Sequence, residues 1–210
     1  MNELVSIVLR SITVSGLATL LASLWSIPLA LVLTVFKTRL SRVLLDIFNS
    51  LVSIPTVVLG LCLYMILSRS GPLGFLELLY TPLAISIGQA LLITPLIVSV
   101  LSNSLSRIKE NVLETAFALG ATSSQAYFAL LHEGLPLLVR SILIGFNRAI
   151  GELGVALMLG GNIRGYTRVM TTAIALEVVK GNFEQALNLG AVFIVVIVLL
   201  TIMIRAIGEK

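Results

Sequence analysis

Residues 107–140, RIKENVLETAFALGATSSQAYFALLHEGLPLLVR, form the one long polar interruption between strongly apolar blocks of this chain. Two residue pairs within it have the spacing of capping boxes, in which a polar side chain and a residue three positions later bind free amides at a helix start. The pairs are Asn111 with Glu114 and Thr122 with Gln125. Gly120 lies between them, and glycine adopts the left-handed backbone angles of a helix end without a steric clash. The stretch therefore predicts two short helices joined by a glycine turn.

Composition places this stretch in a membrane protein. The 210 residues are 58% hydrophobic and 11% charged, whereas about 25% of the residues in soluble domains are charged. The mean hydropathy is +1.09. The net charge of +4 is spread over the ends of the apolar blocks, which is typical of the flanks of membrane helices and not of a nucleic-acid-binding surface. We expect an all-α integral membrane protein surrounded by lipid, with no nucleic-acid partner.

Five apolar blocks reach the roughly 20 residues that a bilayer-spanning helix needs. They cover residues 11–36, 43–67, 83–105, 137–159 and 187–207. The whole chain, residues 1–210, is thus predicted to be a single transmembrane domain. Lys37, Arg39 and Arg42 directly follow the first block, and positive residues flank membrane helices on the cytoplasmic side. This places the amino terminus outside, the polar segment of about residues 107–136 in the cytoplasm and the carboxy terminus inside.

Each of the first three blocks carries a proline, at Pro28, Pro55 and Pro95. A proline inside a helix removes one backbone hydrogen bond and tends to kink the helix. Membrane helices tolerate this where neighbouring helices or water satisfy the freed carbonyl. Two interpretations stay open: the kinks let the bundle bend to open a cavity, or they are the ordinary prolines of membrane helices.

The fourth block combines small and charged residues on one helix face. The small residues are Gly145, Ala149, Ala156 and Gly160. Glu152 lies on the same face, and Arg148 precedes it by four positions, the spacing at which side chains pair on a helix. A charge within a bilayer is costly unless it is paired or faces protein or water. Three roles stay open for Arg148 and Glu152: a structural ion pair that locks two helices, a cation offered to an anion on its path, or a gate whose pairing changes between inward and outward states.

Two motifs resemble known permeases. The sequence ETA at residues 114–116, followed by GA at residues 120–121, resembles the EAA loop of ABC-type import permeases. Residues 145–154, GFNRAIGELG, and 158–163, MLGGNI, are similar to the tungstate-type oxyanion permeases, which are relatives of the molybdate and sulfate permeases. The resemblance runs along nearly the whole chain. One difference is that the LP pair at residues 135–136 follows the glycine a few positions later than in the general import permeases.

The resemblance implies the architecture of a type I ABC importer permease. The residues that would couple a partner ATPase to the membrane helices are Glu114, Ala116, Gly120 and Ala121. Two copies of the chain would form the pathway, and two ATPase subunits would bind ATP and magnesium, so this chain would hold no cofactor itself. An extracytoplasmic binding protein would deliver a tetrahedral oxyanion. Tungstate is the first candidate substrate, with molybdate and sulfate as alternatives.

The segment between the fourth and fifth blocks is predicted to lie outside the membrane. A helix is expected to start at Thr171 or Thr172 and to run through Val179. Arg164 and Arg168 precede that helix. In a permease of this family they are candidates for docking the binding protein, and the alternative is that they only keep an exposed surface soluble.

Some kinds of chemistry have no motif in this sequence. There is no G-x-x-x-x-G-K-[ST] motif, so the chain is not expected to hydrolyse ATP. His132 is the one histidine, and no Cys, His or carboxylate cluster has the spacing of metal ligands. Two other classes stay open. An ATP-independent secondary transporter or channel would use residues 114–120 as an ordinary connecting loop, and a structural subunit of a larger membrane complex would need no pathway.

Overall fold

The computed structural model describes residues 2–36 and 38–208, with side chains for residues 3–36 and 38–202. The described residues contain helices and no strand, which confirms the all-α prediction. The elements are α1 (Asn2–Val35), α2 (Arg39–Leu51), α3 (Thr56–Leu67), the 3-10 helix η1 (Gly74–Leu76), α4 (Pro82–Ala118), α5 (Ser123–Glu133), α6 (Leu135–Ile150), α7 (Gly154–Gly160), α8 (Met170–Val179) and α9 (Phe183–Gly208). Lys37, one of the basic residues used to orient the chain, lies outside the described residues.

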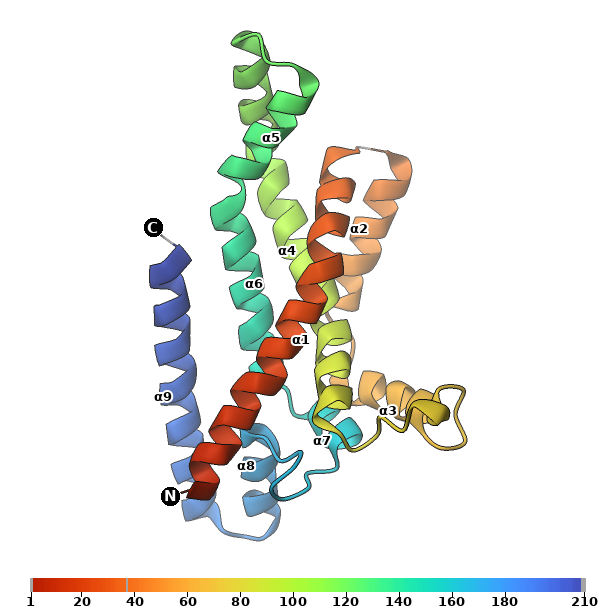
Figure 1. The fold of residues 1–210 in the computed structure, drawn as a ribbon, viewed down its shortest axis with the longest axis vertical. Coiled ribbons are helices and arrows are strands. Elements are labelled where there is room, and N and C mark those ends of the chain that lie inside the picture. The colour runs from red at the N-terminus through yellow and green to blue at the C-terminus, as the bar shows by residue number, and fades with distance from the viewer. Residues whose placement is uncertain (1, 37, 209–210) are drawn as a thin grey trace.

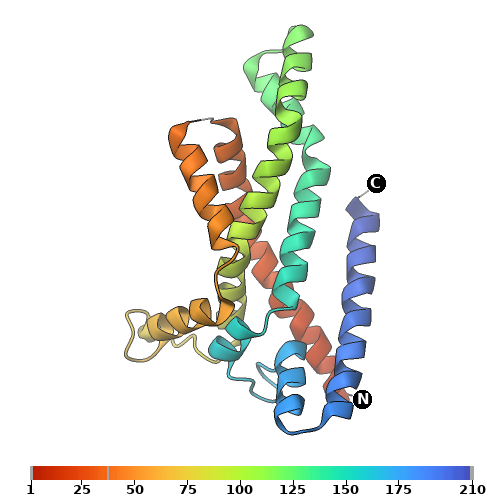
Figure 2. The ribbon, with the colours of Figure 1, turned by 180° about the vertical axis from the view of Figure 1, so that it is seen from behind.

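Four long helices, α1, α4, α6 and α9, run roughly along the long axis of the molecule, and α3 lies across it (Figure 1). The amino terminus lies at one end together with α7 and α8, whereas α5 lies at the opposite end. The end of α1 and the start of α2 also point toward the α5 end, as the view from behind shows (Figure 2). The two segments predicted to be cytoplasmic, of which residues 38–42 and 107–136 are described, therefore lie toward the same end of the fold.

Three helices of the described chain are long and apolar enough to cross a membrane: Glu3–Val35, Pro82–Ala118 and Phe183–Ile202. Up to five spans result if each of two bent helix pairs counts as one. These pairs are α2 with α3, which meet at 101°, and α5 with α6, which meet at 48°. The first span is longer than predicted, because α1 begins at Asn2 and not at residue 11.

The second apolar block, predicted as one span over residues 43–67, is not a single helix. Residues 52–55 separate α2 from α3. Pro55 is the N-cap of α3, where its missing N–H is not needed, and a proline disfavours helical backbone angles at the residue before it. Pro55 therefore lies at the start of a helix instead of kinking one. Pro28 and Pro95 do lie inside helices, as predicted.

Helices α1, α4 and α6 meet at the centre of the fold through small and branched side chains. The buried cluster contains Ala18, Ala22, Ala90, Ile93, Ile97 and Ala149. Small residues let the backbones of membrane helices approach closely. Two buried hydrogen bonds also join α1 to α4: Ser15 Oγ donates to Gln89 Oε1 (3.2 Å), and Ser86 Oγ donates to the carbonyl of Val14 (3.0 Å).

Lys109 fixes the distal part of α4 to the end of α1. Its side chain is buried, and Nζ donates to the carbonyls of Thr34 (2.9 Å) and Val35 (3.0 Å). These are among the last carbonyls of α1, which have no partner within their own helix. The helix dipole also favours a cation at this position. Lys109 therefore acts as a cap for α1 that is supplied by another helix.

We expect the Lys109→Met variant to lower the free energy of unfolding by about 2 kcal/mol, because a hydrogen bond from a charged donor contributes about 1.5–3 kcal/mol. The measurement is the thermal unfolding midpoint of the purified chain in detergent. Arg107→Met is the matched control, since Arg107 is a nearby cation that is exposed. Equal midpoints for the two variants would mean that Lys109 does not hold α4 against α1.

Candidate functional site

The end of α4 is a Schellman motif, a hydrogen-bonded helix end that needs positive φ just past the helix. The N–H of Ala121 donates to the carbonyl of Ala116 (3.0 Å), and the N–H of Gly120 donates to the carbonyl of Phe117 (2.9 Å). Both bonds belong to this motif, and Gly120 supplies the positive φ, 83°. The predicted glycine turn is confirmed. The coupling role of its residues stays a prediction.

One of the two predicted capping boxes is present. The N–H of Gln125 donates to Thr122 Oγ1 (3.4 Å), and the N–H of Thr122 donates to Gln125 Oε1 (2.8 Å), at the start of α5. The box at Asn111 and Glu114 is wrong, because α4 continues unbroken to Ala118 and its internal amides already have partners. Glu114 is therefore an exposed side chain near the end of a long helix and not the cap of a short one.

Apolar side chains are exposed around this turn. Leu119 is 83% exposed and Phe128 is 70% exposed. Phe117, Tyr127 and Leu131 are exposed on the same two helix segments. Figure 1 shows α5 and the end of α4 projecting beyond the other helices. An exposed apolar patch is typical of a surface that contacts another protein or lipid, and sequence reasoning missed Phe128 as a part of it.

Arg148 and Glu152 form the ion pair that their spacing predicts. Arg148 Nη1 lies 2.6 Å from Glu152 Oε2, with the Arg148 side chain 40% exposed and that of Glu152 only 3% exposed. Glu152 Oε1 also accepts the N–H of Val155 (3.2 Å), and the Glu152 carbonyl accepts the hydroxyl of Thr171 (2.9 Å). Each oxygen of the buried Glu152 carboxylate thus accepts a hydrogen bond, whereas the Arg148 side chain is partly exposed.

The small residues of the fourth block lie on two helices and not on one. α6 ends at Ile150 and α7 begins at Gly154, so Glu152 lies in the break between them. A Cβ at Gly145 on α6 would meet Ile97 Cδ1 at 2.8 Å, and a Cβ at Gly160 on α7 would meet Ile85 Cδ1 at 2.6 Å. Both helices therefore use small residues to approach α4. The prediction of close packing is confirmed, and that of one continuous helix over residues 137–159 is wrong.

Arg164 and Arg168 lie in the loop between α7 and α8, but they are not equally exposed. The Arg164 side chain is 74% exposed, whereas that of Arg168 is 16% exposed. Arg164 Nε and Nη2 donate to the two carboxylate oxygens of Glu3 at 2.8 and 2.5 Å. Arg168 Nε donates to Asn162 Oδ1 (3.1 Å), and its Nη1 lies 3.7 Å from Glu3 Oε1. Both arginines are engaged within the chain, which corrects the expectation of two freely exposed cations.

The first turns of α1 hold this loop in place, which sequence reasoning did not foresee. Besides the contacts of Glu3, Arg10 donates to the carbonyls of Arg168 (2.9 Å) and Gly165 (2.8 Å). The helix that follows, α8, spans Met170–Val179, within two residues of the predicted start. In the described part of the chain, no three His, Cys, Asp or Glu residues lie close enough together to hold a metal ion.

The family described as binding-protein-dependent transport system inner membrane component matches residues 23–210. The tungstate uptake system permease protein TupB of Peptoclostridium acidaminophilum is 37% identical over 209 residues, which cover 99% of this chain and 91% of that protein. A probable anion ABC transporter permease protein of Haloferax volcanii is 35% identical, over 94% of this chain and 87% of its own length.

Among solved structures, the MetNI methionine ABC transporter in an inward-facing conformation (CY5 native crystal form) is similar in fold. The TM-score is 0.75, and the match covers 100% of this chain and 94% of that chain. The sequence identity is 21%, so this likeness concerns the fold alone. It agrees with the type I importer architecture expected from the sequence motifs.

Proposed function

We propose that this chain, which belongs to the family of binding-protein-dependent transport system inner membrane components, is the permease of an ATP-driven importer of a tetrahedral oxyanion. Tungstate is the first candidate for that oxyanion. The observation that carries the substrate class is the identity with a tungstate uptake permease along almost the entire chain. Molybdate and sulfate remain the alternatives within the same class. An ATPase and a substrate-binding protein are the partners that such a permease requires.

The structure supports a route by which ATPase motion reaches the membrane helices. The Schellman turn at Gly120 and the capped start of α5 make a compact, hydrogen-bonded end, and the exposed Leu119 and Phe128 offer apolar surface to a partner. The same helix α4 packs against α6 at Gly145 and against α7 at Gly160. A displacement of the turn is therefore carried along one continuous helix to both sides of the break that holds Glu152. Coupling of this kind joins two sites through a rigid element.

A second copy of the chain is part of the proposal. The Arg148 side chain is 40% exposed near the end of α6, and an arginine facing lipid within a bilayer is costly. Its open side is better accommodated by a partner permease or by a water-filled path between two copies. We assign this face of α6 to the pathway. The coupling turn then faces the cytoplasm, and the end with the amino terminus faces outside, where the binding protein docks.

The test is ATP hydrolysis by the chain reconstituted in lipid nanodiscs with its partner ATPase. We expect hydrolysis to rise several-fold when the binding protein loaded with tungstate is added, because the loaded protein favours the state in which the ATPases close. Binding protein loaded with molybdate or sulfate gives the comparison that fixes the anion. No association with the ATPase and no effect of any loaded binding protein would favour an ATP-independent carrier instead.

A further inference from the structure

A polar pocket of about 350 Å³ lies at the end of the fold that carries the amino terminus, between the start of α1, the loop before α8, α8 itself and the start of α9. Its charged lining residues are Glu3, Arg164, Arg168, Glu177 and Lys180. Three of these are cations and two are carboxylates, so the lining keeps a net positive charge. None of these four elements belongs to the coupling turn or carries the Arg148–Glu152 pair.

One side of the pocket is the Glu3–Arg164 pair. Each oxygen of the Glu3 carboxylate accepts a hydrogen bond from a different nitrogen of Arg164, which is the fork geometry by which a guanidinium binds carboxylates and phosphates alike. Glu3 and Arg164 are 46% and 74% exposed at their side chains. Glu3 therefore occupies an arginine fork that is open to solvent and suited to any oxyanion with two adjacent oxygens.

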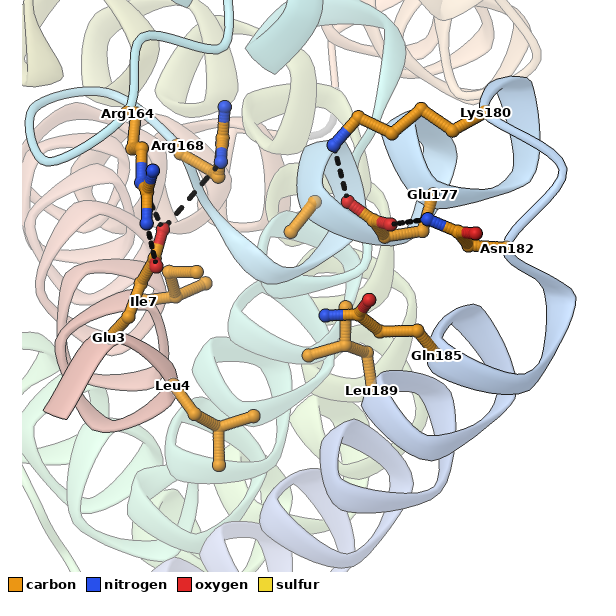
Figure 3. Close-up of a pocket in the computed structure, with 11 residues that line it drawn as sticks. Glu3, Leu4, Ile7, Arg164, Arg168, Glu177, Lys180, Asn182, Gln185 and Leu189 are labelled. Atoms are coloured by element: carbon orange, nitrogen blue, oxygen red, sulfur yellow. Dashed lines mark hydrogen bonds and ion pairs between the residues drawn. The ribbon is translucent and has the colours of Figure 1, made fainter. Parts of the chain in front are cut away.

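The opposite side of the pocket carries the second carboxylate, as Figure 3 shows. Lys180 Nζ donates to Glu177 Oε1 (2.8 Å), and Asn182 Nδ2 donates to Glu177 Oε2 (3.0 Å). These two donors, with the nearby charge of Arg168, hold the pKa of the Glu177 carboxyl below its ordinary value. Glu177 is buried, so it is a fixed counterion, whereas Glu3 is the exposed one. The amide of Gln185 lies between the two sides.

We propose that this pocket is a transient receiving site for the oxyanion, which displaces the Glu3 carboxylate from Arg164 and binds between Arg164, Arg168 and Lys180. The proposal rests on the proposed function, because an importer with its amino terminus outside has this pocket on the outer side of the membrane. The binding protein releases the anion on that side. Glu3 and the anion compete for Arg164 and Arg168. The competition keeps the site weak, and a weak site passes an anion on instead of trapping it.

The test is direct tungstate binding to the complete permease–ATPase complex in nanodiscs, without binding protein and with the nucleotide sites filled by a non-hydrolysable ATP analogue. Bound tungsten is counted by mass spectrometry after equilibrium dialysis. We expect Glu3→Gln to tighten binding by about two- to fivefold, the range that an exposed ion pair represents. We expect Arg164→Gln to weaken binding about tenfold, since it removes charge-assisted hydrogen bonds. Arg69→Gln, an exposed cation outside this pocket, is the control and should leave binding unchanged.

The proposal predicts that the two variants change tungstate affinity in opposite directions. Glu3→Gln and Arg164→Gln break the same ion pair, so a pair that only clamps α1 to the loop would change binding in the same direction, or not at all, and would overturn the proposal. Tungstate uptake by the wild-type complex with its binding protein is measured in parallel. If the wild-type complex takes up tungstate but neither variant changes tungstate binding, the pocket is rejected and the importer function is kept. If the two variants change tungstate binding as expected but the wild-type complex takes up no oxyanion, the importer function is rejected and the anion site is kept.

Discussion

The Gly120→Val variant is expected to insert normally but to lose binding-protein-dependent uptake about tenfold, because left-handed backbone angles cost an L-residue roughly 1–2 kcal/mol and 1.4 kcal/mol is a factor of ten. Gly120 has φ of 83°, and no heavy atom lies within 4 Å of a Cβ built there. The backbone is therefore the source of the effect and not a steric clash. The measurement is tungstate uptake into proteoliposomes, with membrane yield as the check on insertion.

The matched control for this variant is Gly181→Val. Gly181 has φ of 80° and equally open surroundings, but it lies in the turn between α8 and α9. It imposes the same strain far from the coupling turn, so binding of the partner ATPase should be retained in Gly181→Val and weakened in Gly120→Val. Gly120→Asn should retain more uptake than Gly120→Val, since asparagine tolerates left-handed angles. Equal losses of ATPase binding in the variants at Gly120 and Gly181 would contradict a coupling role for the first turn.

The Glu152→Ala variant is expected to lower the stability of the folded chain by about 3 kcal/mol, near the lower end for removal of one partner of a buried ion pair. The lower end applies because Arg148 is 40% exposed, while Glu152 is 3% exposed. The N–H of Val155 also loses its acceptor. Folded yield and the thermal midpoint in detergent are the measurements. A folded yield and a thermal midpoint equal to those of the wild type would mean that the pair with Arg148 does not stabilise the fold.

The double variant Arg148→Met with Glu152→Met separates the roles left open for the pair. A purely structural pair is replaced by apolar contacts, so stability and uptake should both recover relative to Glu152→Ala. A pathway or gating role requires the charges themselves, so stability recovers while uptake stays low. The non-additive part of the double-mutant cycle gives the strength of the coupling.

The elements that could be predicted from sequence are those determined by local chemistry. The glycine turn at Gly120 and the capping box at Thr122 depend on residues within a few positions, and both are present. The supposed box at Asn111 failed for a physical reason. Its spacing is right, but the preceding residues already form a helix that packs on α1 and α6, so no free amides remain to be capped.

The parts that could not be predicted depend on distant contacts. Gly151 and Pro55 are compatible with either a kink or a break, and packing of the neighbouring helices decides which occurs. Glu3 pairs with Arg164 across 161 positions, and Lys109 caps α1 across 75. No periodicity connects such residues. Sequence patterns marked Arg164 and Arg168 as candidate residues but gave no hint that the amino-terminal turn already engages them.

The unbroken length of α4 has a consequence for how the protein sits in its membrane. Its 37 residues span about 55 Å at roughly 1.5 Å per residue, against a hydrocarbon core of about 30 Å. Even a tilt of about 40° leaves roughly 40 Å along the bilayer normal. The coupling end therefore extends beyond the hydrocarbon core, and Lys109 braces this part of α4 against α1. Thinning or thickening of the bilayer would change how deeply this part of α4 is immersed without covering the surface offered to a soluble partner.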